Sequence, residues 1–120
     1  MHVEKVIQFD KQDKEADLLV SDGRYSVICY AYPIESVRQN QKVTELYGFN
    51  STSIFKVAEK VCSIKKLSSY YEYTFIAQVI SVMEGIVQIG EIRIHLDTEI
   101  PKDIFNGEYI SFSVVRLDIC

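Results

Sequence analysis

Hydrophobic and polar residues alternate along much of the chain with a period of two, which is the pattern of strands with one buried face. The longest such run covers residues 71–96. A turn at Glu84-Gly85 would fold this run into one antiparallel hairpin whose inner face is almost entirely apolar. The residues expected on that face include Tyr73, Phe75, Ala77, Val79, Ile92, Ile94 and Leu96. The pattern therefore predicts a long central hairpin around which the rest of the chain is organised.

The opposite face of this hairpin is polar far from the turn and apolar beside it. Its apolar residues are Ile80, Val82, Val87 and Ile89. Another part of the chain or a second molecule must cover such a patch, so an oligomer contact through these four residues is one expectation. Gly90 interrupts the inner face without a side chain, which predicts a bend or a bulge in the second strand.

A second hairpin is indicated by Asp22-Gly23, because aspartate and glycine tolerate the positive φ angles of a two-residue turn. Pairing outward from this turn brings apolar residues together on one face. The expected pairs are Val20 with Tyr25, Leu18 with Val27, and Ala16 with Cys29. Turn chemistry and cross-strand pattern agree on this register.

Shorter patterns predict three further strands, at residues 2–9, 42–49 and 108–119. In the last of these, the apolar positions change phase at Val115, which predicts a bulge or burial on both faces. Residues 97–107 contain a proline at a suitable first helical position and an Asn-Gly stop, which together predict a single helical turn.

The segment 53–67 fits two kinds of element. Its apolar residues recur at helical spacing, Ser53 is a suitable N-cap, and Lys65 and Lys66 suit a helix C-terminus. Its valines and isoleucines are equally typical of strands. The pattern favours a helix and leaves a strand open.

The order hairpin, candidate helix, hairpin and closing strand resembles the OB fold, in which a helix commonly lies between the third and fourth strands. Residues 107–114 match a barrel-closing strand. The expected fold class is therefore mainly β, a small antiparallel, OB-like, partly open barrel of five to seven strands with one candidate helix at 53–67. At 120 residues, the chain is expected to form a single domain over 1–120.

Charge is distributed unevenly along the chain. The formal net charge is −4, and from Glu72 onward there are eight acidic and three basic residues, a net charge of −5. An acidic surface repels phosphate backbones, so nucleic acid is disfavoured and a basic protein partner is favoured. The balance of 48% hydrophobic and 25% charged residues is that of a folded globular domain.

The sequence also bears on location. No apolar run follows Met1, and no apolar stretch reaches the length of about 18 residues needed to cross a bilayer. The cysteines, Cys29, Cys62 and Cys120, are odd in number and widely spaced, which fits a reducing compartment better than a disulfide framework. A cytoplasmic protein without membrane contact is expected.

Residues able to perform catalysis or bind a metal are few. A metal site requires three or four clustered ligands, and His2 and His95 are the only histidines. The sequence lacks a nucleophile motif and a glycine-rich phosphate loop, so no catalytic residue, metal or cofactor is predicted. Asp97, Glu99 and Asp103 cluster between predicted strands, where they suit a solvated loop or an acidic contact surface. An enzyme that uses this acidic cluster or His95 is a further alternative.

The chain contains eight tyrosines, a residue type that favours protein interfaces because its ring buries area while its hydroxyl stays hydrated. The preferred hypothesis is a non-enzymatic protein-binding module that masks a basic protein through an acidic, tyrosine-bearing face. Toxin-neutralising immunity proteins are similar in size and charge. An OB-type single-stranded nucleic-acid-binding protein is the first alternative. The residues expected to bind the partner are Tyr71, Glu72, Tyr73, Glu91, Asp97, Glu99 and Asp103.

Overall fold

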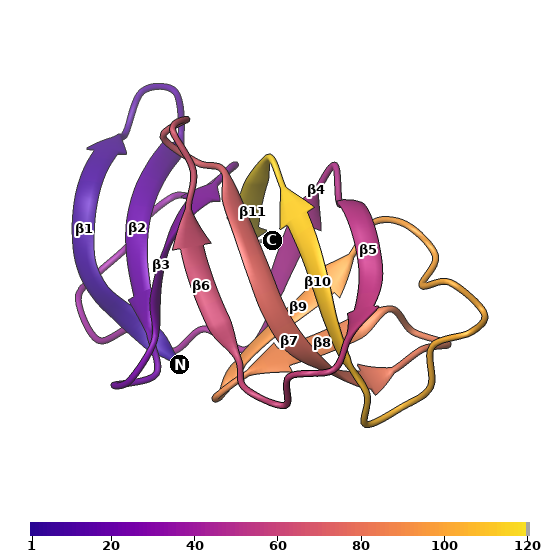
Figure 1. Cartoon of the computed structure of the whole chain (residues 1–120). Coiled ribbons are helices and arrows are strands. Elements are labelled where there is room, and N and C mark those ends of the chain that lie inside the picture. The colour runs from indigo at the N-terminus through magenta and orange to yellow at the C-terminus, as the bar shows by residue number, and fades with distance from the viewer. Residues whose placement is uncertain (120) are drawn as a thin grey trace.

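A computed structural model describes residues 1–119, and Cys120 lies outside the described residues. This range contains eleven strands and no helix, and therefore no helix that could cross a membrane. The prediction of a mainly β fold is confirmed, whereas the predicted count of five to seven strands was too low. The strands are β1 (His2–Asp10), β2 (Glu15–Ser21), β3 (Ser26–Ala31), β4 (Leu46–Phe49), β5 (Thr52–Val57), β6 (Ser63–Lys66), β7 (Tyr73–Ser81), β8 (Ile86–Ile89), β9 (Ile92–Leu96), β10 (Tyr109–Val114) and β11 (Arg116–Ile119) (Figure 1).

All eleven strands belong to one sheet. Its order is β1-β2-β3-β11-β4-β9-β8-β7-β10-β5, and β6 pairs with β7 beside this path. The sheet is open, because its outer strands β1 and β5 do not pair with each other. Most neighbouring strands are antiparallel, but β11 runs parallel to β3 and β4 runs parallel to β9.

Val115 is the single residue between β10 and β11. Before it, β10 pairs with β5 and β7, and after it, β11 pairs with β3 and β4. One continuous stretch of chain thus connects two distant parts of the strand order, so the sheet curls back toward itself (Figure 1). This change of strand partners accounts for the shift of the apolar positions at Val115, because a different set of side chains faces the core once the neighbouring strands change.

The core is built from alternate residues of the strands, as the period of two predicts. All seven residues named for the inner face of 71–96 are buried. The Phe75 ring lies at its centre, with ring centroids 5.3 Å from those of both Tyr73 and Phe112. Full burial of an apolar side chain of this size contributes about 1.5–3 kcal/mol, so this aromatic row is a main source of stability.

The long hairpin predicted for 71–96 is wrong in its pairing. β7 pairs with β8 only over its last residues, where Val79 lies opposite Val87. The chain then turns back at Gly90, and β9 pairs with β8 rather than with β7. Gly90 therefore makes a turn, with a φ of 58°, and not a bulge within a strand. A turn at Glu84-Gly85 would pair Val79 with Gly90, so the observed pairing is shifted by three residues, and an odd shift turns Val87 and Ile89 from the outer face to the core.

The fold divides the apolar patch expected beside the β7–β8 turn. Val87 and Ile89 are fully buried in the core of this chain. Ile80 is 37% exposed, and Val82 is half-buried at the edge of the core. Two of the four residues expected to form an oligomer contact are therefore covered by the chain itself.

The Asp22-Gly23 turn forms where it was predicted, but it spans residues 22–25 instead of two residues. Val20 pairs with Val27 rather than with Tyr25. The Asp22 carboxylate explains the longer turn, because it accepts a hydrogen bond from the Tyr25 amide at 2.7 Å. Its second oxygen accepts one from the Glu91 amide, also at 2.7 Å, which docks this turn against the β8–β9 turn. Since the register shift is two residues, the predicted apolar face is retained.

The helix predicted at 53–67 is wrong, because β5 and β6 occupy this segment. β5 pairs with β10 and β6 pairs with β7, so the backbone forms its hydrogen bonds across the sheet. Ile54 and Ile64 pack against the core, whereas Val61 is 69% exposed, so the helical spacing does not mark one buried face. Residues 97–107 likewise form turns rather than the predicted helical turn.

Candidate functional site

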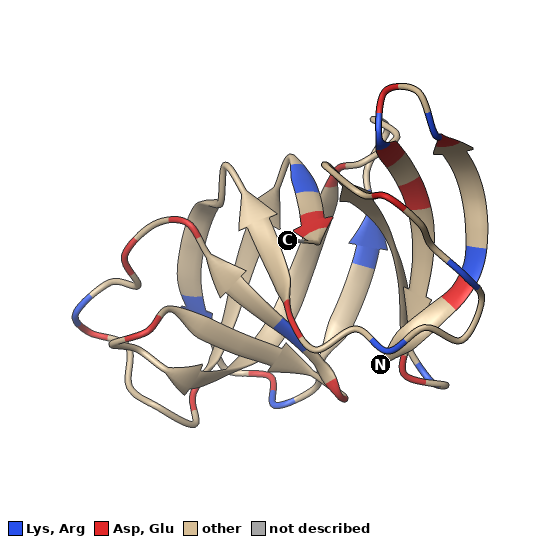
Figure 2. Cartoon of the chain, turned by 180° about the vertical axis from the view of Figure 1, so that it is seen from behind, with Lys and Arg blue, Asp and Glu red and all other residues tan. Residues whose placement is uncertain are grey.

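The seven residues expected to bind a partner do not form one cluster. Two lie in the β6–β7 loop, one in the β8–β9 turn, three in the long β9–β10 connection, and one in the core. In that order they are Tyr71 and Glu72; Glu91; Asp97, Glu99 and Asp103; and Tyr73. Acidic residues are therefore spread over the molecule, and Figure 2 shows acidic stretches of the ribbon both at the β1–β2 end and in the β9–β10 connection at the other end.

Tyr73 belongs to the core and is only 4% exposed. Its phenol oxygen accepts a hydrogen bond of 2.9 Å from the backbone amide of Ile28 in β3. Burial raises the pKa of this phenol, and the hydrogen bond from Ile28 works in the opposite direction. Tyr73 therefore joins β7 to β3 and offers no surface to a partner.

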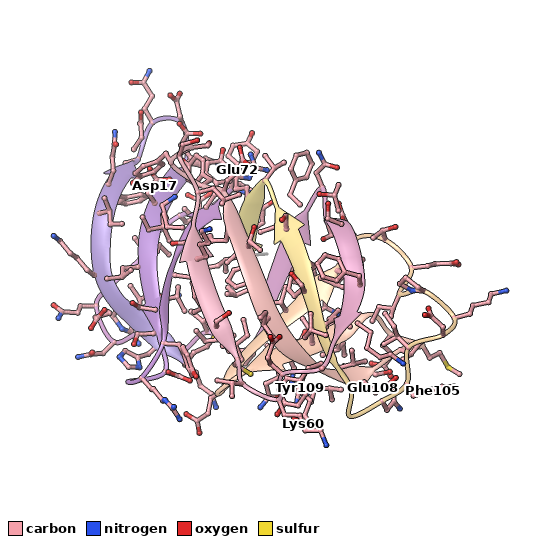
Figure 3. All side chains as sticks on the ribbon, viewed as in Figure 1. Asp17, Lys60, Glu72, Phe105, Glu108 and Tyr109 are labelled. Carbon is pink, nitrogen blue, oxygen red and sulfur yellow. The ribbon has the colours of Figure 1, made fainter. Side chains whose placement is uncertain are left out.

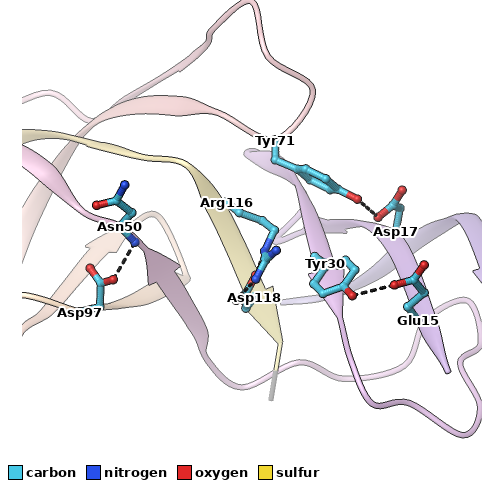
Figure 4. Close-up of polar contacts among 8 residues, drawn as sticks. All are labelled: Glu15, Asp17, Tyr30, Asn50, Tyr71, Asp97, Arg116 and Asp118. Atoms are coloured by element: carbon cyan, nitrogen blue, oxygen red, sulfur yellow. Dashed lines mark hydrogen bonds and ion pairs between the residues drawn. The ribbon is translucent and has the colours of Figure 1, made fainter. Parts of the chain in front are cut away.

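Asp97 holds the β4–β5 turn in place. Its two carboxylate oxygens accept hydrogen bonds from the backbone amides of Asn50, at 2.6 Å, and Ser51, at 2.8 Å (Figure 4). Partial burial acts to raise the pKa of Asp97, but the amide donors outweigh it and the pKa is lowered. All three acidic residues are exposed, but the Asp97 carboxylate is engaged in holding a turn, whereas Glu99 and Asp103 form no salt bridge within residues 1–119.

His95 lies on the outer face of β9. Its ring stacks on that of Tyr47 at a centroid distance of 4.9 Å, and its Nε2 is 2.8 Å from a carboxylate oxygen of Glu45. Although this distance is short, Nε2 has no hydrogen-bond partner of good geometry, so the contact with Glu45 does not qualify as a hydrogen bond. Within residues 1–119, no group of three or more His, Cys, Asp or Glu side chains is arranged to hold a metal ion.

A cluster of phenols and carboxylates surrounds Tyr71, a predicted residue that is half-buried and whose side chain bonds to a side chain distant in the sequence. The Tyr71 hydroxyl donates a hydrogen bond of 2.6 Å to Asp17, and the Tyr30 hydroxyl donates one of 2.7 Å to Glu15 (Figure 4). These side chains border a hollow of about 210 Å³, here called the tyrosine hollow. Its lining residues are Gln8, Asp10, Glu15, Ala16, Asp17, Tyr30 and Tyr71.

Strand geometry places the carboxylates of the tyrosine hollow. Along β2, Ala16 and Leu18 are buried, so Glu15 and Asp17 point to the outer face. Tyr30 lies directly opposite Asp17 in the β2–β3 ladder, which brings its ring to the same face. The floor of the hollow is therefore part of a regular and rigid pair of strands.

The β6–β7 loop covers this floor with Tyr71. A backbone hydrogen bond from Leu67 to Glu72 closes the loop at 3.0 Å. The Lys66 ammonium group donates to the carbonyl oxygens of Ser69, at 2.8 Å, and Tyr70. Lys66 is thereby occupied within the loop, and burial lowers its pKa. These bonds hold the Tyr71 ring over β2 and β3.

The tyrosine hollow carries an excess of negative charge. Burial, and then the hydrogen bond to Asp17, raise the pKa of Tyr71, so the phenol stays protonated and donates. The hydrogen bond to Glu15 likewise raises the pKa of Tyr30. Among residues 1–119, Asp10, Glu15 and Asp17 form no salt bridge. The Tyr71 and Tyr30 phenols each donate to one oxygen of a carboxylate, and an ionised carboxylate has room to accept further hydrogen bonds.

Arg116 lies beside the hollow but does not neutralise it. Its guanidinium donates two hydrogen bonds to Asp118, at 2.5 and 3.0 Å, and these raise its pKa. The same group lies over the rings of Tyr30 and Phe49, at 4.5 and 4.9 Å from their centroids. Arg116 is thus already paired and stacked, and the Phe49 ring is left 49% exposed.

Sequence reasoning named Tyr71 and missed the residues that it contacts. The outward direction of Glu15 and Asp17 is readable from the alternation along β2, and so is the polar character of this face. Nothing in the sequence links them to Tyr71, because 54 residues separate Asp17 from Tyr71 and the link depends on how β7 packs against β3.

Comparison of the chain with protein-family models, with curated proteins and with solved structures found no match. Since a fold by itself does not determine a function, the argument for function rests on the side chains described above.

Proposed function

We propose that this protein is a non-enzymatic binding module that masks a basic protein by taking one of its lysine or arginine side chains into the tyrosine hollow. The observation that carries the proposal is the set of carboxylates Asp10, Glu15 and Asp17, which form no salt bridge within residues 1–119 and surround a hollow bordered by phenol rings.

The size of the hollow supports a single side chain as its occupant. Its volume of about 210 Å³ is smaller than the roughly 300–1,000 Å³ of sites that enclose drug-sized ligands. An arginine head group has five N–H donors in a planar arrangement that suits carboxylates such as Glu15 and Asp17. The ring of Tyr71 supplies aromatic surface that favours a cation, as the Tyr30 ring beside it already does for Arg116. The chemistry of the hollow therefore fits a basic side chain better than an anion or an apolar group.

A masking role is compatible with the distribution of charge. The acidic residues at both ends of the molecule would steer a basic partner toward it and raise the rate of association (Figure 2). Once bound, the chain would cover the partner's basic surface, as toxin-neutralising immunity proteins do. Its role would then be steric occlusion, without a chemical step of its own.

A second candidate is single-stranded nucleic-acid binding, the function implied by the OB-like element order. The observation in its favour is a row of aromatic groups on the outer face of β4 and β9, where Tyr47 stacks on His95 and Phe49 stacks on Arg116. Exposed rings of this type are platforms for unpaired bases. The candidate ranks second because Asp118 pairs with Arg116 and the neighbouring tyrosine hollow is acidic.

The test uses three probes: a short arginine-rich peptide, a glutamate-rich peptide of equal length, and a single-stranded DNA oligonucleotide. Binding is measured by calorimetry at low and moderate salt, for the wild type and for the double variant Glu15→Gln/Asp17→Asn. The matched control is Glu4→Gln/Glu59→Gln, which removes the same charge from exposed positions that form no salt bridge. We expect the hollow variant to weaken binding of the arginine-rich peptide about tenfold and the control to change it little.

Equal effects of the two double variants would show that only net charge matters, and would refute the role of the hollow. Oligonucleotide binding that falls steeply with salt, together with no preference for the arginine-rich peptide, would favour the second candidate.

A further inference from the structure

A second exposed surface lies at the other end of the molecule from the tyrosine hollow. It consists of four apolar residues at the end of β7, in the β7–β8 turn and in the β9–β10 connection, here called the turn patch: Ile80, Val82, Met83 and Phe105. Met83 is 96% exposed and Phe105 is 67% exposed. Figure 3 shows Phe105 and Asp17 at opposite ends of the molecule. Contiguous exposed apolar residues of this kind mark contact surfaces more often than isolated ones do.

The turn patch is continuous and hollowed. One concavity of about 510 Å³ lies between Val82 and Phe105. A second, of about 360 Å³, lies between Val82 and Glu99 and includes Met83 in its lining. Because Val82 lines both, the two concavities form one surface with room for more than one side chain of a partner.

Hydrogen bonds and buried anchors hold the turn patch in shape. The Val82 amide donates a hydrogen bond of 2.8 Å to the side chain of Asn106, which ties the β7–β8 turn to the β9–β10 connection. The Phe105 amide donates one of 2.8 Å to Glu108, and Ile104 beside it is buried. Phe105 is therefore held outward by its backbone, and a partner that binds it would lose little entropy in ordering this loop.

The rim of the turn patch is acidic. Its charged residues are Glu84, Asp97, Glu99 and Asp103 against Lys102. Within residues 1–119, Glu84, Glu99 and Asp103 form no salt bridge, so their charge is free to act on a partner. A second copy of this chain would bring two such rims together in a symmetric contact and is disfavoured by repulsion.

We infer that the turn patch binds a basic amphipathic segment of a protein partner. An apolar side chain of that segment fills the concavity between Val82 and Phe105, and its lysines or arginines lie over Glu99 and Asp103. Met83 supplies a flexible and polarisable surface that adapts to the shape of the inserted side chain. The inference rests on the proposed function, because it gives the basic partner a second, apolar contact in addition to the tyrosine hollow.

The chain contains two methionines, Met83 in the turn patch and Met1, which packs against the core away from it. Protein labelled with ¹³C in the methionine methyl groups is titrated with an amphipathic leucine–lysine peptide. A leucine–glutamate peptide of the same length serves as the comparison. We expect the leucine–lysine peptide to shift the Met83 methyl signal and not that of Met1, and we expect the leucine–glutamate peptide to shift neither.

Phe105→Ser is expected to weaken binding of the leucine–lysine peptide by about tenfold or more, as loss of an aromatic anchor does. The matched control is Phe55→Ser, because Phe55 is 55% exposed on β5 and lies outside the turn patch. The charge variant Glu99→Gln/Asp103→Asn is expected to weaken binding and to reduce its dependence on salt. Equal binding of the two peptides, or equal effects of the two phenylalanine variants, would overturn the inference.

The two proposals fail separately. Glu15→Gln/Asp17→Asn should leave the Met83 response to the leucine–lysine peptide unchanged, and Phe105→Ser should leave binding of the arginine-rich peptide to the tyrosine hollow unchanged. A dimer detected by sedimentation that Phe105→Ser abolishes would overturn the inference and reassign the turn patch to contact between copies. A Met83 signal that stays in place at saturating peptide would also refute it.

Discussion

Replacing Tyr73 by phenylalanine tests whether this residue stabilises the fold or binds a partner, since sequence and structure assign it different roles. The change keeps the ring, with its packing against Phe75 at a centroid distance of 5.3 Å, and removes only the hydroxyl. The hydroxyl oxygen accepts a hydrogen bond of 2.9 Å from the Ile28 amide. The variant therefore leaves one backbone donor without its partner and creates almost no cavity.

The size of the effect follows from the surroundings of that amide. An amide left without a partner in the interior costs about 1–3 kcal/mol, and the Ile28 amide is only partly buried, so we expect about 1–2 kcal/mol. For a chain of 120 residues, an unfolding entropy of about 2.1 cal/mol/K per residue gives a fall in Tm of about 4–8 °C. The ring stays in place, so the tyrosine hollow should bind the arginine-rich peptide as the wild type does.

The assay is equilibrium unfolding in urea, combined with thermal unfolding and the peptide titration described above. Tyr32→Phe is the matched control, because Tyr32 is 59% exposed and has no side-chain hydrogen bond among the described residues. We expect the control to change the free energy of unfolding by less than about 0.5 kcal/mol. The slope with urea should be the same for all three proteins, because none of the changes alters the surface exposed on unfolding.

A Tyr73→Phe variant as stable as the control would refute the reasoning, because the Ile28 amide would then not depend on the phenol. A variant that keeps its stability but loses affinity for the arginine-rich peptide would show that the Tyr73 hydroxyl contacts the partner. This result would contradict the assignment of Tyr73 to the core between β7 and β3.

Three further changes test other parts of the structure. Gly90→Ala should destabilise the protein by about 1–3 kcal/mol in urea, because φ is +58° and a Cβ would overlap the Asp22 carboxylate. Gly23→Ala, at φ +96° with no atom near the new Cβ, should cost less. Asp97→Asn should destabilise the protein at neutral pH. Because the folded pKa of Asp97 is lowered, this difference should begin to shrink as pH falls below about 4 and should vanish only at still lower pH, where the folded wild-type carboxyl is protonated too. The raised pKa of Tyr71 favours the neutral phenol in the fold, so stability should fall as pH rises above about 10, and Tyr71→Phe should lessen this fall.

The sequence by itself determined the buried face of β7. Alternation placed Phe75, Ala77 and Val79 on an inner face, and all three are buried. The change of phase at Val115 likewise marked the point where the closing strand changes neighbours. These features are predictable because the direction of a side chain depends only on its position along its own strand.

Strand partners depended on the tertiary structure. The segment 53–67 had the spacing of a helix, but the ladder positions beside β7 and β10 were available and its β-branched residues fit them. The shift of two residues after Asp22 leaves the buried face unchanged, so a pattern with a period of two cannot select one of these two pairings. The pairing within 71–96 does change a buried face, because Val87 and Ile89 were expected on the outer face and lie in the core.

The candidate sites show the same limit. The acidic and aromatic residues that a contact surface needs were visible in the sequence, but their grouping was not. Tyr71 contacts Asp17 across 54 residues, Asp97 holds a turn, and Tyr73 lies in the core, as its place on the inner face indicates, and not on a contact surface. Composition and alternation are local properties that the sequence carries in full, whereas a site is a set of distances between strands, and only the packing of the curled sheet determines those distances.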